Sequence, residues 1–115
     1  KDLEEFTLVQ AQPNSDPSWF GFMLTLTDKA SFTRNEIVEY LESNNIQTRN
    51  LFAGNMLRHP LFDALEENVE YKQIGTLTNT DKIMNDSFWV GVWPGLGKEE
   101  LDFVVKEINS YILNL

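Results

Sequence analysis

Few side chains in this sequence could take part in catalysis. There is one histidine, His59, and there is no cysteine, so the sequence offers no thiol nucleophile and no multi-histidine or cysteine metal site. No serine or aspartate stands at a spacing that makes a nucleophile–base pair with His59 recognisable. We therefore interpret His59 as a partly exposed residue beside Pro60 at the start of a helix, since a Ser-His-Asp triad could arise here only by a spatial accident.

A candidate anion site lies around Gly54 and Asn55, at a predicted strand-to-helix junction. Free backbone amides at the start of a helix can hold a phosphate. Arg49 and Arg58 stand on either side, and guanidinium groups bind planar anions well. Turn geometry alone also explains Gly54 and Asn55, and arginines commonly balance surface carboxylates. Both interpretations stay open on these residues alone.

Composition restricts the class of protein. The 115 residues are 42% hydrophobic and 23% charged, with a net charge of −9, which indicates one globular domain and disfavours binding to the phosphate backbone of nucleic acids. No run approaches the roughly 20 apolar residues that span a bilayer, and the acidic start is unlike a signal peptide. Since the first residue is not methionine, we expect a piece of a longer polypeptide.

The first half of the chain predicts a central strand and a helix. The apolar run 19–26 is short and rich in aromatic residues, as in a strand that is buried on both faces. Thr33 and Glu36 have the spacing of a capping box, so a helix should begin there and end near Asn44 and Asn45. Residues 46–52 favour a strand, and residues 56–65 should turn helical around Pro60.

The second half predicts a brief helix, a strand and a long helix. Asn79 or Thr80 can cap a helix that runs to Asn85, and the apolar run 88–93 predicts a second strand. From Lys98 onward the pattern is that of an amphipathic helix whose acidic residues form a solvated face. Its apolar positions are Leu101, Val104, Val105, Ile108, Ile112 and Leu115. We expect an α+β domain in which helices cover one face of a small, mostly antiparallel sheet.

Three stretches carry a more specific signal: PSWFGF at 17–22, IQTRNLFAGN at 46–55 and NTDKIMNDSFWVGV at 79–92. In wording and order they resemble the C-terminal part of the DegT/DnrJ/EryC1/StrS sugar aminotransferase family. Within that family they resemble the sugar 3-dehydratase branch, which acts on CDP-4-keto-6-deoxy-D-glucose in lipopolysaccharide biosynthesis. The resemblance covers essentially the whole chain.

The resemblance implies a type I pyridoxal-phosphate fold, with residues 1–115 forming the small C-terminal domain that closes the active site. It implies a cytoplasmic enzyme, most simply a homodimer, in which a large domain of the same chain carries pyridoxamine or pyridoxal phosphate. The substrate would be a CDP-sugar, and an iron–sulfur flavoprotein reductase would deliver electrons. The catalytic histidine would lie upstream, so this segment alone should be inactive and should bind no cofactor.

The resemblance also implies which residues line the substrate pocket. Phe52, Gly54, Asn55 and Arg58 stand where family members line the sugar-nucleotide side of the site, and Arg49 would support them. Two alternatives remain. One is a pyridoxal-phosphate-dependent sugar aminotransferase of the same family, and the other is a non-catalytic interaction module whose face is the acidic last helix.

Overall fold

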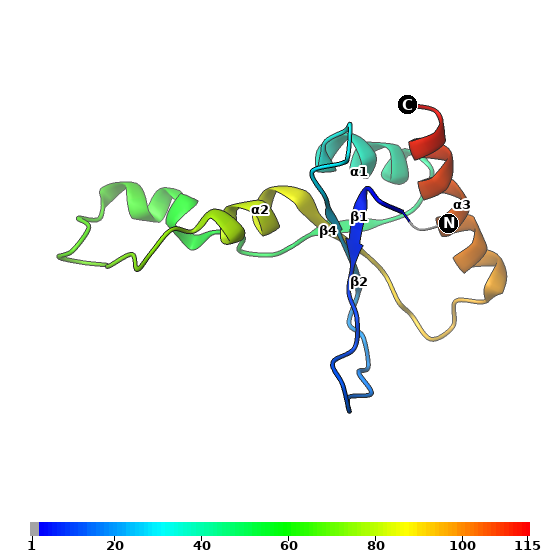
Figure 1. Cartoon of the computed structure of the whole chain (residues 1–115), viewed down its shortest axis with the longest axis horizontal. Coiled ribbons are helices and arrows are strands. Elements are labelled where there is room, and N and C mark those ends of the chain that lie inside the picture. Colours follow the sequence, from blue (N-terminus) through cyan, green and yellow to red (C-terminus); the bar gives the residue numbers. More distant parts are fainter. Residues whose placement is uncertain (1–2) are drawn as a thin grey trace.

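A four-stranded antiparallel sheet forms the centre of the molecule (Figure 1). The computed structural model describes residues 3–115. The strands stand in the order β1-β2-β4-β3, so β2 and β4 are central and pair with each other. Their bounds are Phe6–Leu8 (β1), Phe22–Leu26 (β2), Thr48–Asn50 (β3) and Ser87–Val90 (β4).

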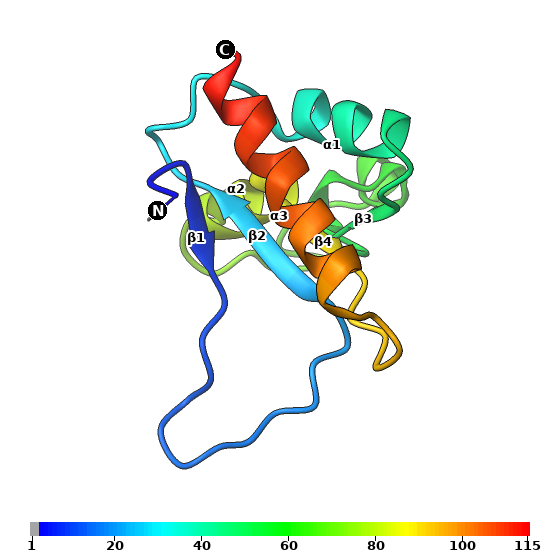
Figure 2. The ribbon, with the colours of Figure 1, turned by 90° about the vertical axis from the view of Figure 1, so that its right-hand side faces the viewer.

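Helices lie on both sides of this sheet rather than on one. The α-helices are Arg34–Ser43 (α1), Thr78–Asp86 (α2) and Lys98–Leu113 (α3), and two 3-10 helices span Met56–Arg58 (η1) and Pro60–Ala64 (η2). Figure 2 shows α1 and α3 in front of the sheet and α2 behind it. The α+β class is confirmed, whereas the expectation that helices cover a single face holds only for α1 and α3. None of the helices among residues 3–115 is long and apolar enough to cross a membrane.

The core lies between the sheet and the pair of helices α1 and α3. Side chains of directly opposed strand residues share a face, and the pairs Leu24–Phe88 and Phe6–Leu26 both point into this core. The strand β2 therefore buries one face only, and it begins at Phe22. The prediction of a strand from residue 19 that is buried on both faces was wrong, because the preceding aromatic residues lie outside the strand and are exposed.

Helix α1 forms as its sequence predicts. The Glu36 carboxylate accepts hydrogen bonds from the Thr33 amide (2.6 Å) and hydroxyl (2.8 Å), and the Thr33 hydroxyl accepts from the Glu36 amide (3.3 Å). These bonds lower the pKa of the Glu36 carboxyl. Asn45 takes a left-handed backbone conformation just after the helix, as a helix end requires.

Helix α2 begins differently from its prediction. The residue before its first turn is Leu77, which supplies no side-chain cap, and the predicted caps Asn79 and Thr80 lie within the helix. The Asp81 amide bonds to the Leu77 carbonyl (2.8 Å), so the helix starts two or three residues earlier than the polar side chains suggest.

Helix α3 begins at Lys98 as predicted, but two of its features differ. Glu107 is buried rather than solvated, and its carboxylate accepts a hydrogen bond from the Tyr40 hydroxyl (2.8 Å). Leu101, Val105 and Leu115, which were predicted to face the core, are exposed. The stripe is buried at Ile108, whereas an open apolar cavity separates Leu101 and Val105 from the strand residues that face them.

Candidate functional site

Three aromatic rings gather on the sheet face that points away from α1 and α3. Trp89 of β4 is the direct strand partner of Arg49 on β3. The ring of Phe20 lies 4.7 Å from that of Trp89, and the ring of Phe52 lies 5.9 Å from it on an edge-to-face approach. We call Phe20, Phe52 and Trp89 the aromatic face.

Gly21 makes room for the central ring. A Cβ atom at this position would lie 1.7 Å from Cε3 of Trp89, a severe steric clash for two non-bonded atoms. The indole therefore lies directly over the Gly21 backbone. This close approach explains why a glycine interrupts the aromatic run 19–22 and why Trp89 can lie flat on the sheet.

Two polar groups accompany the aromatic face, one buried and one exposed. Nε1 of Trp89 is buried and has no hydrogen-bond partner among residues 3–115. Arg49 donates one hydrogen bond to the Thr48 carbonyl (2.7 Å), and its side chain helps to line a small cavity of about 160 Å³ together with Phe20, Gln47 and Trp89. Phe20 is 80% exposed, so the rings and the guanidinium form an open surface.

Asn55 and Arg58 are joined to Asp81 of α2. Asn55 is only 2% exposed; its Nδ2 donates to Asp81 Oδ1 (2.7 Å) and its Oδ1 accepts from the Leu57 amide (3.1 Å). Arg58 donates from Nε (3.2 Å) and Nη2 (2.8 Å) to the two Asp81 oxygens. The Arg58 bond, followed by that of Asn55, lowers the pKa of the Asp81 carboxyl to about 2. We call these three residues the Asp81 clasp.

Gly54 is required by the backbone at the start of this segment. Ala53 and Gly54 both have positive φ angles, 68° and 59°, a region that glycine adopts at least cost. A Cβ atom at Gly54 would also lie 2.6 Å from Cγ of Met84. His59 contacts the Ala53 carbonyl through Nε2. It lies directly before the 3-10 helix that Pro60 begins, which agrees with its predicted structural place.

The five predicted site residues thus fall into two groups. Phe52 and Arg49 belong to the open aromatic face, whereas Asn55 and Arg58 bond to Asp81 and Gly54 packs against Met84. Their role in substrate binding stays a prediction. Sequence reasoning missed Phe20, Trp89 and Asp81, because the first two lie in apolar runs typical of a core and nothing in the spacing pairs Asp81 with Asn55.

The phosphate of a pyridoxal cofactor would need a cationic cradle, and two cations among residues 3–115 are already paired with carboxylates. Such a cradle needs free cationic groups or amides that converge on one cavity. Lys82 instead pairs with Asp28 (2.8 Å) and Asp86 (3.0 Å), and Arg58 pairs with Asp81. Arg49 is one cation beside the aromatic face. That this chain alone binds no cofactor stays a prediction.

The fold of this chain matches one part of two larger solved structures. Two solved structures of GDP-4-keto-6-deoxymannose-3-dehydratase, a variant with bound GDP-perosamine and the E. coli enzyme with bound hydrated PLP, each superpose with a TM-score of 0.78 at 21% identity. The match covers 92% of this chain and 26% of each of those chains. Residues 1–109 match the DegT/DnrJ/EryC1/StrS aminotransferase family, and the chain belongs to that family.

Two curated relatives are more similar in sequence. The chain is 47% identical over 108 residues to the lipopolysaccharide biosynthesis protein RfbH of Salmonella typhimurium, and 48% identical over 110 residues to dTDP-4-dehydro-2,6-dideoxy-D-glucose 3-dehydratase of Saccharopolyspora spinosa. These matches cover 94% and 96% of this chain but only 24% and 23% of the relatives. The chain spans about a quarter of the length of these relatives.

Proposed function

We propose that this chain is the small C-terminal domain of a pyridoxamine-phosphate-dependent nucleotide-sugar 3-dehydratase, and that it closes the substrate pocket of that enzyme. One observation carries the proposal. The three sequence stretches that resemble the dehydratase branch each contribute one ring to the aromatic face, namely Phe20, Phe52 and Trp89. Residues from three stretches that are distant in sequence converge on one open surface, as residues that share a ligand do.

The proposed substrate is a CDP-linked 4-keto-6-deoxyglucose. The relatives named above are a dTDP-sugar and a GDP-sugar dehydratase, and the choice of CDP rests on the sequence resemblance. Arg49 supports an anionic ligand, because its guanidinium lies at the edge of the aromatic face and can donate paired hydrogen bonds to a diphosphate.

In this proposal the chain binds and orients the sugar substrate and excludes water from it. In the full-length enzyme the cofactor, when bound, supplies the electron sink that allows the 3-hydroxyl to leave. The aromatic face would cover the sugar side of the pocket. By excluding water, it would strengthen the electrostatic contacts between enzyme and substrate. The Asp81 clasp fixes residues 55–58 to α2 and thereby positions Phe52, which is three residues from Asn55.

Several partners complete the proposal. The large domain of the same polypeptide would hold the cofactor, a second copy would form a homodimer, and an iron–sulfur flavoprotein reductase would supply electrons. In this arrangement the isolated segment has no activity, because it contributes no catalytic group.

Substitutions on the aromatic face of the full-length enzyme test the proposal. Arg49→Ala should raise the KM for CDP-4-keto-6-deoxyglucose roughly tenfold, since a hydrogen bond to a charged group contributes about 1.5–3 kcal/mol. Phe52→Ala should raise it several-fold by removing apolar cover. The matched controls are Lys106→Ala and Leu61→Ala, which remove an exposed cation and an exposed apolar side chain elsewhere. If KM is the same in all four variants, the pocket does not include this surface.

A further inference from the structure

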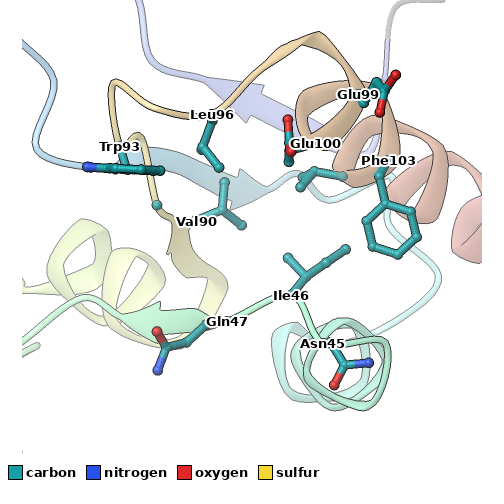
Figure 3. Close-up of a pocket in the computed structure, with 11 residues that line it drawn as sticks. Asn45, Ile46, Gln47, Val90, Trp93, Leu96, Glu99, Glu100 and Phe103 are labelled. Carbon is teal, nitrogen blue, oxygen red and sulfur yellow. The ribbon is translucent and has the colours of Figure 1, made fainter.

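A second cavity lies on the α3 side of the sheet and shares Gln47, Val90 and Gly91 with the small cavity at the aromatic face. Its volume is about 540 Å³, and it opens between the turn after α1, the loop from β4 to α3 and the first turns of α3 (Figure 3). Ile46, Leu96 and Phe103 supply much of its apolar wall. We call this cavity the α3 groove.

An exposed tryptophan stands at one end of the α3 groove. Trp93 is 71% exposed, although a large aromatic side chain is normally covered. Its ring lies over Gly95, where a Cβ atom would approach Cη2 of Trp93 to 2.2 Å. The Leu96 amide bonds to the Trp93 carbonyl (3.0 Å) and closes the turn. The ring is therefore held in place by its own loop and still presents a surface to solvent.

The charged side chains that line the α3 groove are all negative. Glu99 and Glu100 line it, and no lysine or arginine does. Glu100 accepts a hydrogen bond from the Gly97 amide (2.8 Å), and Glu99 has no ion-pair partner among residues 3–115. The neighbouring Lys98 pairs with Asp102 rather than with either glutamate. The net charge of −9 adds to this negative field.

We propose that the α3 groove docks a protein segment in which lysines or arginines flank a large apolar side chain. The apolar side chain would fill the space between Ile46 and Phe103. One cation would lie against the face of Trp93 at one end of the groove, and the other near the carboxylate of Glu99 at the opposite end (Figure 3). Cations over an indole ring are attracted by its negative face. The same groove of a second copy is a poor occupant because the two acidic linings would repel each other, and a nucleic acid or anionic lipid surface is repelled for the same reason.

Peptide binding to the full-length protein tests this inference. The probe is a fluorescein-labelled Lys-Leu-Lys-Leu-Lys peptide, followed by fluorescence polarisation, with Ser-Leu-Ser-Leu-Ser as the uncharged control. The lysine peptide should bind and the serine peptide should not. Trp93→Ala and Glu99→Lys should each raise the Kd about fivefold or more, the change expected when about 1 kcal/mol of cation–π or ionic contact is lost.

Glu67→Lys is the matched control for charge. Glu67 is exposed and lies on the segment that projects away from the sheet (Figure 1), so this variant makes the same change of two charge units far from the groove. Its Kd should stay within about twofold of the unaltered protein, because exposed charges that far apart are screened by salt. Failure of the lysine peptide to bind overturns the inference. So does a Kd that is unchanged in Trp93→Ala, or one that rises as much in Glu67→Lys as in Glu99→Lys.

Discussion

Asp81 receives three hydrogen bonds from the segment before the 3-10 helices, one from Asn55 and two from Arg58. A buried amide and a bidentate guanidinium on one carboxylate make a specific local joint. The joint fixes the backbone that carries Phe52 to helix α2. At the scale of single residues, the polar groups of Asn55 and Arg58 therefore position the segment, while Arg49 and the aromatic face remain open to a ligand.

The Asp81 clasp predicts a pH-dependent stability difference. The folded-state pKa of Asp81 is lowered to about 2 from 3.8, so its stabilising effect is present above about pH 4 and is lost as the pH falls through about 2. Asp81→Asn should lower the urea midpoint of the full-length protein at pH 7. The difference between variant and parent should shrink as the pH falls from 4 to 2.

Glu67→Gln is the control for the clasp, because it also neutralises one exposed carboxylate, and Glu67 makes no ion pair among the described residues. Its urea midpoint should follow that of the parent at every pH. A difference between Asp81→Asn and the parent that does not change between pH 7 and pH 2 would contradict the role of the Asp81 charge.

Gly21 predicts a second effect at the scale of one residue. Gly21→Ala places a methyl group where the Trp89 ring lies, so the ring must move and the aromatic face is disrupted. We expect a rise in KM for the nucleotide sugar and a loss of about 1–3 kcal/mol in stability, as for other overpacked sites. Gly91→Ala is the control for stability, since a Cβ there meets nothing within 4 Å. A loss of stability in Gly21→Ala that is no larger than in Gly91→Ala would contradict the account of Trp89.

At the scale of elements, local signals predict helices better than strands. The capping box at Thr33 and Glu36 fixes the start of α1, and the apolar stripe beginning at Leu101 marks α3. Strands β1 and β3 are only three residues long and exist because neighbouring strands pair with them. Strand pairing is a tertiary effect, so the apolar runs 19–26 and 88–93 indicate the central strands without giving their ends.

The candidate site was predictable only in part for the same reason. Sequence resemblance marks Arg49 and Phe52, which lie close together in the chain. The contacts of Phe20 with Trp89 and of Asn55 with Asp81 join residues 69 and 26 positions apart. They depend on strand register and on the path of residues 51–77, which no local pattern specifies.

The packing of α1 predicts a large effect at its buried face. Leu41 is fully buried between α1, α3 and the sheet, so Leu41→Ala should destabilise the protein by about 2–5 kcal/mol through lost burial and a cavity. Leu61→Ala makes the same chemical change at a residue that is 69% exposed and should change stability by less than about 0.5 kcal/mol. Chemical denaturation followed by circular dichroism measures both, and similar losses would contradict the assigned core.

At the scale of the whole molecule, the chain is extended, and part of its apolar surface is not covered by other residues of the chain. Its principal extents are 54 × 37 × 24 Å, and the segments 9–21 and 51–77 project away from the sheet (Figures 1 and 2). An apolar cavity of about 420 Å³ lies between the sheet and α3, next to the exposed side chains of Leu8, Leu101 and Val105. Apolar surface of this extent is typical of a contact with another part of a larger protein.

That surface predicts different behaviour for the isolated chain and for the full-length protein. The isolated chain should bind the apolar dye ANS, because its cavity beside α3 is open, whereas the full-length protein should bind much less. The double variant Leu101→Gln, Val105→Gln should reduce dye binding by the isolated chain. Dye fluorescence reports both, and equal dye binding per molecule by the isolated chain and the full-length protein would show that no other domain covers this surface.

The most direct test of the central claim is made on the full-length protein. The protein is loaded with pyridoxal phosphate, its absorbance is used to verify that the cofactor is bound, and the sample is reduced with borohydride before its intact mass is measured. The resemblance to the dehydratase branch implies that a histidine upstream of this chain replaces the usual Schiff-base lysine, so the protein should hold the cofactor without a covalent adduct. A mass increase equal to the reduced cofactor would show a Schiff-base lysine, and would mean that this chain belongs to a sugar aminotransferase instead.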